Sequence, residues 1–95
     1  MESLLGTVLR DEKKAIDLVC RIYILEYQAG YDKNTKTIID KAKVKPNINE
    51  IQKEIEDIRK VYQQLDYSIR YSPGLERVMS ELNVFGCKIA EAAWS

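Results

Sequence analysis

The segment INEIQKEIEDIRKVYQQLDYSI, Ile48 to Ile69, decides the fold because its apolar residues recur at alternating steps of three and four. They are Ile48, Ile51, Ile55, Ile58, Tyr62, Leu65 and Ile69. This heptad spacing is typical of a helix that packs along one seam against another helix, as in a coiled coil. Asn47 and Glu50 are spaced as in a capping box, so we expect a helix from Asn47 to about Tyr71. Its seam requires a second helix, in the same chain or in another.

A second heptad pattern follows the first and predicts its partner. It consists of Leu75, Val78, Leu82, Phe85, Ile89 and Ala92. Pro73 restricts Ser72 and disrupts helical hydrogen bonding, while the Ser-Pro pair also begins a new helix. The C-terminal half of the chain is therefore expected to form an antiparallel helical hairpin.

The N-terminal third predicts another long helix, which Ser3 caps and which runs to about Ala29 before a stop at Gly30. Apolar residues occupy most of its circumference, so we expect it to be central. A narrow polar stripe, expected to be its solvent edge, contains Arg10, Lys14, Asp17, Arg21 and Gln28. The segment between residues 31 and 46 predicts only one short helix or helical turn. The expected fold is an all-α small helical bundle of three long helices plus one short helix.

Length and composition indicate a single globular domain that covers residues 1–95. Hydrophobic residues make up 45% and charged residues 32%, which is too apolar for a disordered chain and too charged for a membrane protein. The 15 basic residues balance the 15 acidic ones, so binding to nucleic acid is disfavoured. The N-terminus lacks the basic lead and long apolar run of a signal peptide, and we expect a cytoplasmic location.

Reactive side chains are scarce. The chain contains no histidine, which removes the commonest general base and transition-metal ligand. Its two cysteines, Cys20 and Cys87, lie on or beside apolar stripes, where free cysteines behave as small hydrophobes. Glu26 is a lone acid on the apolar flank of the first helix, where burial would raise its pKa. We therefore expect no enzyme activity, catalytic residue, metal or cofactor.

Self-association is expected because the domain is small and its helices carry more apolar surface than a single core of this size can bury. Gly86 and Ala90 begin a strip of small residues that allows close approach of another backbone. Trp94, near the end of the sequence, is expected to be an anchor on its own domain or on a neighbouring protomer. The predicted partner or oligomer interface consists of Ile48, Ile51, Ile55, Gly86, Ala90 and Trp94.

A possible ligand site involves Tyr67 and Tyr71, which lie one helical turn apart and outside the heptad seam. Aromatic rings beside cations are a typical platform for a nucleotide or a cyclic dinucleotide. The cations are Arg59, Arg70 and two lysines of the connector, Lys41 and Lys43. Burial of the rings in the bundle or a dimer, and a solvated lysine loop, are the competing and more common explanations.

These features favour a small intracellular interaction module that binds a partner protein as a homo-oligomer, dimer or higher. Adaptors, inhibitors and regulatory subunits act in this way. The alternative hypothesis is a binder or sponge for a small anionic ligand, with its site between protomers.

Overall fold

The computed structural model describes the backbone of residues 4–94 and the side chains from residue 10 onward. Three long helices dominate it, namely α1 (Leu4–Gln28), α3 (Ile48–Gln63) and α5 (Pro73–Ala93). The short helices are α2 (Lys41–Val44) and α4 (Tyr67–Arg70), and two-residue strands β1 (Tyr31–Asp32) and β2 (Thr37–Ile38) pair as a hairpin. The predicted all-α class is confirmed. Ser3, the predicted cap of the first helix, lies outside the described residues.

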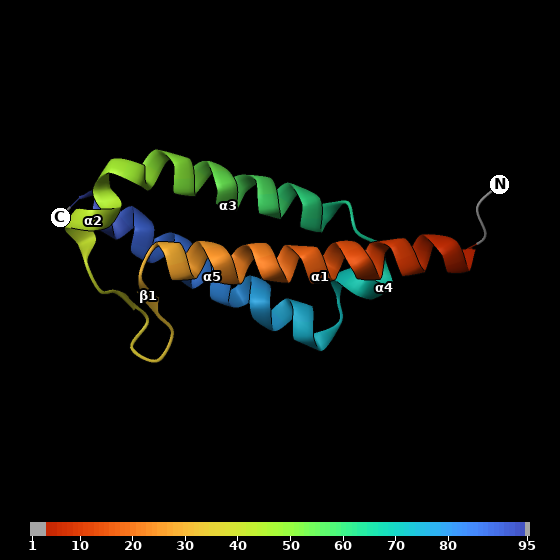
Figure 1. Cartoon of the computed structure of the whole chain (residues 1–95). Coiled ribbons are helices and arrows are strands. Elements are labelled where there is room, and N and C mark those ends of the chain that lie inside the picture. The colour runs from red at the N-terminus through yellow and green to blue at the C-terminus, as the bar shows by residue number, and fades with distance from the viewer. Residues whose placement is uncertain (1–3, 95) are drawn as a thin grey trace.

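The three long helices lie lengthwise beside one another, with α1 and α5 running in one direction and α3 in the other (Figure 1). Each helix turns one apolar stripe toward a common core, as the three-four spacing predicts. Burial of these stripes is the main source of stability in such a small domain. The largest fully buried hydrophobic side chains are Leu18, Ile22, Ile58, Leu82, Phe85 and Ile89.

Helix α1 stops where the sequence predicts, because Gly30 adopts the left-handed conformation with φ of 69°. The short helix predicted between residues 31 and 46 is present as α2, but it is preceded by a hairpin that was not predicted, in which β1 and β2 pair with Tyr31 opposite Ile38. The carboxylate of Asp32 accepts hydrogen bonds from the backbone N–H groups of Asn34 and Thr35, which favours a turn over a helix. The ring of Tyr31 then packs edge-on against Phe85, with centroids 5.2 Å apart, and attaches the hairpin to the core.

The start of α3 also differs from the prediction in its details. The side chain of Asn47 makes no capping hydrogen bond. Instead Asp40 caps α2 by accepting a hydrogen bond from the N–H of Lys43, and a 3-10 turn (Lys45–Asn47) leads directly into α3. Because that turn supplies preceding carbonyls to the first N–H groups of α3, the capping box is not needed.

The predicted helix from Asn47 to Tyr71 is wrong in its second half, because α3 ends at Gln63 and α4 begins at Tyr67. Asp66 causes the break: its carboxylate accepts hydrogen bonds from the backbone N–H and the hydroxyl of Ser68, and so caps α4. These bonds also hold the pKa of Asp66 below its ordinary value. The buried carboxylate of Asp11 accepts the N–H of Asp66 at 2.6 Å, which attaches the break to α1.

Helix α5 begins at the predicted Ser-Pro pair, with Pro73 in the first turn. The hydroxyl of Ser72 donates to the carbonyl of Ile69 at 2.8 Å rather than accepting from α5. The same side chain therefore closes α4 and positions the start of α5.

Candidate functional site

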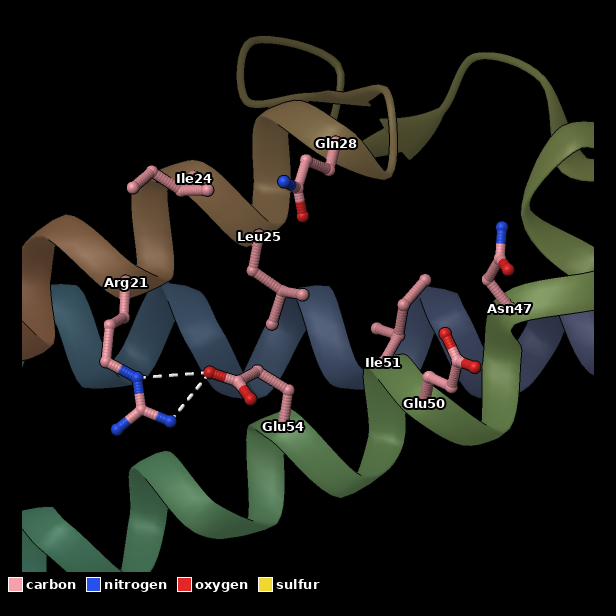
Figure 2. A pocket seen from close by; sticks show the side chains of 8 residues that line it. All are labelled: Arg21, Ile24, Leu25, Gln28, Asn47, Glu50, Ile51 and Glu54. Atoms are coloured by element: carbon pink, nitrogen blue, oxygen red, sulfur yellow. Dashed lines mark hydrogen bonds and ion pairs between the residues drawn. The ribbon is translucent and has the colours of Figure 1, made fainter.

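A groove lies between α1 and α3 (Figure 2). It encloses about 490 Å³, and Leu25 and Ile51 point toward each other across its floor. Its polar lining comes from Gln28, Asn47 and Glu50. An apolar floor with a polar rim is the usual composition of a surface that receives another chain.

An ion pair forms one end of this groove. The guanidinium of Arg21 donates to Glu54 Oε1 from Nη2 at 2.6 Å and from Nε at 3.0 Å. Both side chains are partly buried, and the double donation fixes their orientation. The Arg21–Glu54 ion pair therefore links the two helices across the groove (Figure 2).

A second hollow lies on the other side of the Arg21–Glu54 ion pair. It encloses about 370 Å³ and has Arg21 in its wall as well, with the buried side chains of Leu18 and Leu65 beneath it. Lys14 and Asp17 form its polar edge on α1. The polar stripe predicted as the solvent edge of α1 is exposed, apart from the partly buried Arg21, and it also borders the two hollows.

A second exposed side of α1 is largely apolar. Ile16, Cys20, Tyr23, Ile24 and Tyr27, here called the α1 stripe, follow the helical spacing and are all exposed. The exposed fraction is 64% for Ile16, 56% for Ile24 and 86% for Tyr27. Contiguous apolar surface of this kind marks interaction sites on soluble proteins. The expectation that α1 is apolar on more than one face is met, but its second face is left uncovered within the described chain.

The predicted interface residues divide into three groups. Ile48, Ile51 and Ile55 are buried in the core of the single chain, so the seam that raised the question of a partner is filled by α1 and α5. Gly86 and Ala90 line a groove of about 550 Å³ between α3 and α5, together with Ile55 and Arg59.

Trp94, the last of the predicted interface residues, ends α5 and is 91% exposed. It is therefore not an anchor on its own domain. Its role against a neighbouring protomer stays a prediction.

The predicted ligand site is only partly assembled. Tyr67 and Tyr71 are 70% and 52% exposed, which excludes the core, and their ring centroids lie 4.6 Å apart. The guanidinium of Arg70 lies 5.4 Å from the centroid of Tyr71 and 5.9 Å from that of Tyr67. Both distances are within the range of cation–π attraction.

The other cations of that site lie elsewhere. Arg59 is on α3, where its Nη2 donates to Asn83 Oδ1 at 3.1 Å. Lys41 and Lys43 are exposed on α2, at the opposite end of the bundle from α4 (Figure 1). One chain therefore does not bring the lysines to the tyrosines.

Glu26 is a buried carboxylate whose pKa is raised. Its side chain is 1% exposed, neither oxygen accepts a hydrogen bond, and the ammonium of Lys33 lies 3.8 Å from Oε2. Burial raises the pKa of Glu26, an effect that Lys33 partly offsets and Glu81 reinforces. The expected raised pKa is thus present, and Glu81 is a second acid whose charge acts on Glu26.

No protein-family model, curated protein or solved structure matches this chain. Within residues 4–94, none of the helices combines the length and the apolar character needed to cross a membrane. The same described residues hold no cluster of three or more acidic or cysteine side chains suited to a metal ion. Function is therefore argued from the surfaces of the molecule.

Two surfaces on α1 were not predicted from the sequence, for different reasons. The α1 stripe was visible as excess apolar residues, but spacing alone does not say which of two apolar faces is buried. The groove depends on how far apart α1 and α3 stand, which no local pattern encodes. The pairing of Arg21 with Glu54, 33 residues away, was likewise beyond local spacing.

Proposed function

We propose that this protein is a small interaction module that acts as a homo-oligomer and binds an amphipathic helix of a partner protein in the groove between α1 and α3. The groove itself is the observation that carries the proposal: it has an apolar floor at Leu25 and Ile51 and a polar rim. A helix laid in such a groove buries one apolar face and leaves its polar face in water.

The dimensions and charge of the groove indicate the kind of helix. Helix α3 has 16 residues and so extends roughly 24 Å, which matches a partner helix of about four turns. The ion pair of Arg21 and Glu54 neutralises itself, and the remaining charge beside the floor belongs to the exposed carboxylate of Glu50. We infer that the partner helix carries apolar anchors and a lysine or arginine near Glu50.

A charge reversal tests this assignment. The tagged wild-type protein is purified from its own cells, the bound protein is identified, and its affinity is then measured with purified components. Glu50→Lys is expected to weaken binding roughly tenfold, which corresponds to about 1.4 kcal/mol. Glu56→Lys, on the same helix but outside the groove, is the matched control and should bind as the wild type does.

Equal affinity of the wild type and Glu50→Lys for the purified partner would contradict the proposal. Weakening by Glu56→Lys to the same degree as by Glu50→Lys would also contradict it, because the effect would then reflect net charge and not the groove.

A second function is supported by the exposed cluster of Tyr67, Tyr71 and Arg70, which suits stacking and cation–π contact with a nucleotide. Because Lys41 and Lys43 lie at the other end of the chain, such a site takes lysines only from a second protomer. Calorimetric titration with a panel of nucleotides and cyclic dinucleotides tests it. Tyr67→Ala should abolish the heat of binding, while the free energy of unfolding changes by less than about 0.5 kcal/mol because the ring is exposed. No heat with the wild-type protein rejects this function.

A further inference from the structure

The α1 stripe has a symmetry that goes beyond its apolar character. Four residues of the α1 stripe, Ile16, Cys20, Ile24 and Tyr27, line up with Lys13 one turn before them, while Tyr23 lies on their flank. These five positions are separated by three, four, four and three residues, so the spacing is the same in both directions from Cys20. Reversal about Cys20 exchanges Ile16 with Ile24 and Lys13 with Tyr27. All five side chains are exposed on the side of α1 that faces away from the core.

We propose that the α1 stripe is the contact surface of an antiparallel homodimer, with Cys20 on its two-fold axis. In an isologous interface each position of one copy meets the reversed position of the other, and the stripe is self-complementary in this sense. Ile16 of each copy packs against Ile24 of the second copy. The small side chain of Cys20 at the centre allows the two helices to approach closely.

The residues at the two ends of the contact also pair favourably when the two copies are related by an axis at Cys20. Lys13 of one copy meets the ring of Tyr27 in the second copy, which is a favourable cation–π contact rather than a buried charge. Glu12 lies on the same flank of α1 as Tyr23, and the reversal brings it toward the end of the second copy where Lys33 sits 3.7 Å from the Tyr23 ring centroid. The two-fold axis repeats this contact at the other end of the interface, so opposite charges meet at both ends of the same flank.

The area is sufficient for a stable pair. Ile16, Tyr23, Ile24 and Tyr27 together expose roughly 500 Å² in each copy, at about 200 Å² for a whole tyrosine side chain. A standard interface buries about 800 Å² per partner, and the polar flanks of α1 supply the remainder. The stripe thus provides the apolar centre and the flanks provide the rim.

The dimer rests on the proposed function, since it assigns an interface to the self-association that the function includes. It leaves the groove between α1 and α3 open. Glu50 and the floor residues Leu25 and Ile51 do not belong to the stripe, and the two surfaces meet only at Ile24. Test variants therefore avoid Ile24.

Cysteine cross-linking tests the axis directly. Two single-cysteine variants are treated with a short bismaleimide: Cys87→Ala, which keeps Cys20, and Cys20→Ala, which keeps Cys87. Both thiols are exposed in one chain, so they are matched in access. Rapid formation of a covalent dimer is expected when Cys20 remains and not when Cys87 remains. A dimer formed equally by both, or only through Cys87, overturns the proposal.

Sedimentation equilibrium over a hundredfold dilution is the second measurement. The wild-type protein is expected at twice 11.0 kDa, and the double variant Ile16→Lys, Tyr27→Lys at 11.0 kDa with unchanged helical circular dichroism. Ile39→Lys is the control, because Ile39 is 75% exposed but lies outside the stripe, and it should remain dimeric. A wild-type monomer, or a double variant that stays dimeric, overturns the proposal. A monomer that still binds its partner through Glu50 overturns the dimer and the self-association in the proposed function, while helix binding in the groove stands.

Discussion

Replacement of Glu26 by glutamine should stabilise the protein at neutral pH. The carboxylate is buried and accepts no hydrogen bond, its ion-pair partner is the ammonium of Lys33 at 3.8 Å, and the charge of Glu81 acts against it. A glutamine of the same shape keeps the packing and removes the charge. The ammonium of Lys33 is about half exposed, so it loses little when its partner becomes neutral.

The size of the gain follows from the state of this side chain. A buried polar group without a hydrogen bond costs about 1–3 kcal/mol, and a charged one costs more. Glutamine still bears the neutral part of this cost, so Glu26→Gln should raise the free energy of unfolding at pH 7 by about 1 kcal/mol. For a domain of this size the melting temperature should rise by roughly 4–8 °C.

The sign of the pH dependence is also determined. Because the folded-state pKa of Glu26 is raised above its ordinary value of 4.5, the folded state binds this proton more tightly than the unfolded state does. The stabilising effect of protonation is fully present below pH 4.5 and is lost as the pH rises through the folded pKa. The advantage of Glu26→Gln over the wild type should therefore be largest at pH 7 and vanish near pH 4.

Urea unfolding followed by circular dichroism at pH 7 and pH 4 measures both effects. All samples are kept at one protein concentration, because self-association adds to the apparent stability. Glu56→Gln, at an exposed position on α3, is the control and should change the free energy by less than about 0.5 kcal/mol. A less stable Glu26→Gln at pH 7, or a gain that is equal at both pH values, would refute the reasoning.

Three further changes probe the fold. Phe85→Ala should cost about 3–5 kcal/mol in urea unfolding, because it empties the centre of the core, and a loss below about 1 kcal/mol would contradict the packing. Tyr62→Phe removes the hydroxyl that donates to the carbonyl of Arg70 at 2.7 Å. The free energy of unfolding should fall by about 1 kcal/mol and hydrogen exchange in α4 should become faster. Unchanged exchange would argue against a role of this hydrogen bond in holding α4. Lys33→Met takes away the ion-pair partner of Glu26 and should lower the melting temperature at pH 7 but not at pH 4, whereas an equal loss at both pH values would assign the effect to packing.

The sequence was sufficient for the helices that carry strong periodicity. The alternation of three and four at Ile48, Ile51 and Ile55 predicted a buried stripe on α3, and Gly30 and Pro73 marked a helix end and a helix start. These features are local, because period and backbone restriction act within one or two turns. The helix content of the chain followed from them.

The errors arose where short polar side chains compete with a helix. The heptad pattern continues through Leu65 and Ile69, but Asp66 caps a new helix with Ser68 and interrupts it. Asp32 likewise bends the chain into a hairpin that was not predicted, ahead of the predicted short helix α2. Both positions carry an aspartate that bonds backbone N–H groups two or three residues ahead, a signal that was present in the sequence.

The surfaces were harder to predict than the elements. Two faces of α1 are apolar, and periodicity does not say which of them is buried in the core and which is exposed as the α1 stripe. Only the packing of α3 and α5 against one side of α1 decides between them. The groove that carries the proposed function is a product of that packing.

Site-specific photo-cross-linking from the groove tests the central claim most directly. A photoreactive residue replaces Gln28, which lines the groove, or Thr35, an exposed hairpin residue that serves as the control. In the protein's own cells, position 28 should capture one protein through an amphipathic helix, position 35 should not, and Glu50→Lys should reduce the yield of the product. The claim would be contradicted by identical products from both positions, or by a product at position 28 whose yield Glu50→Lys leaves unchanged.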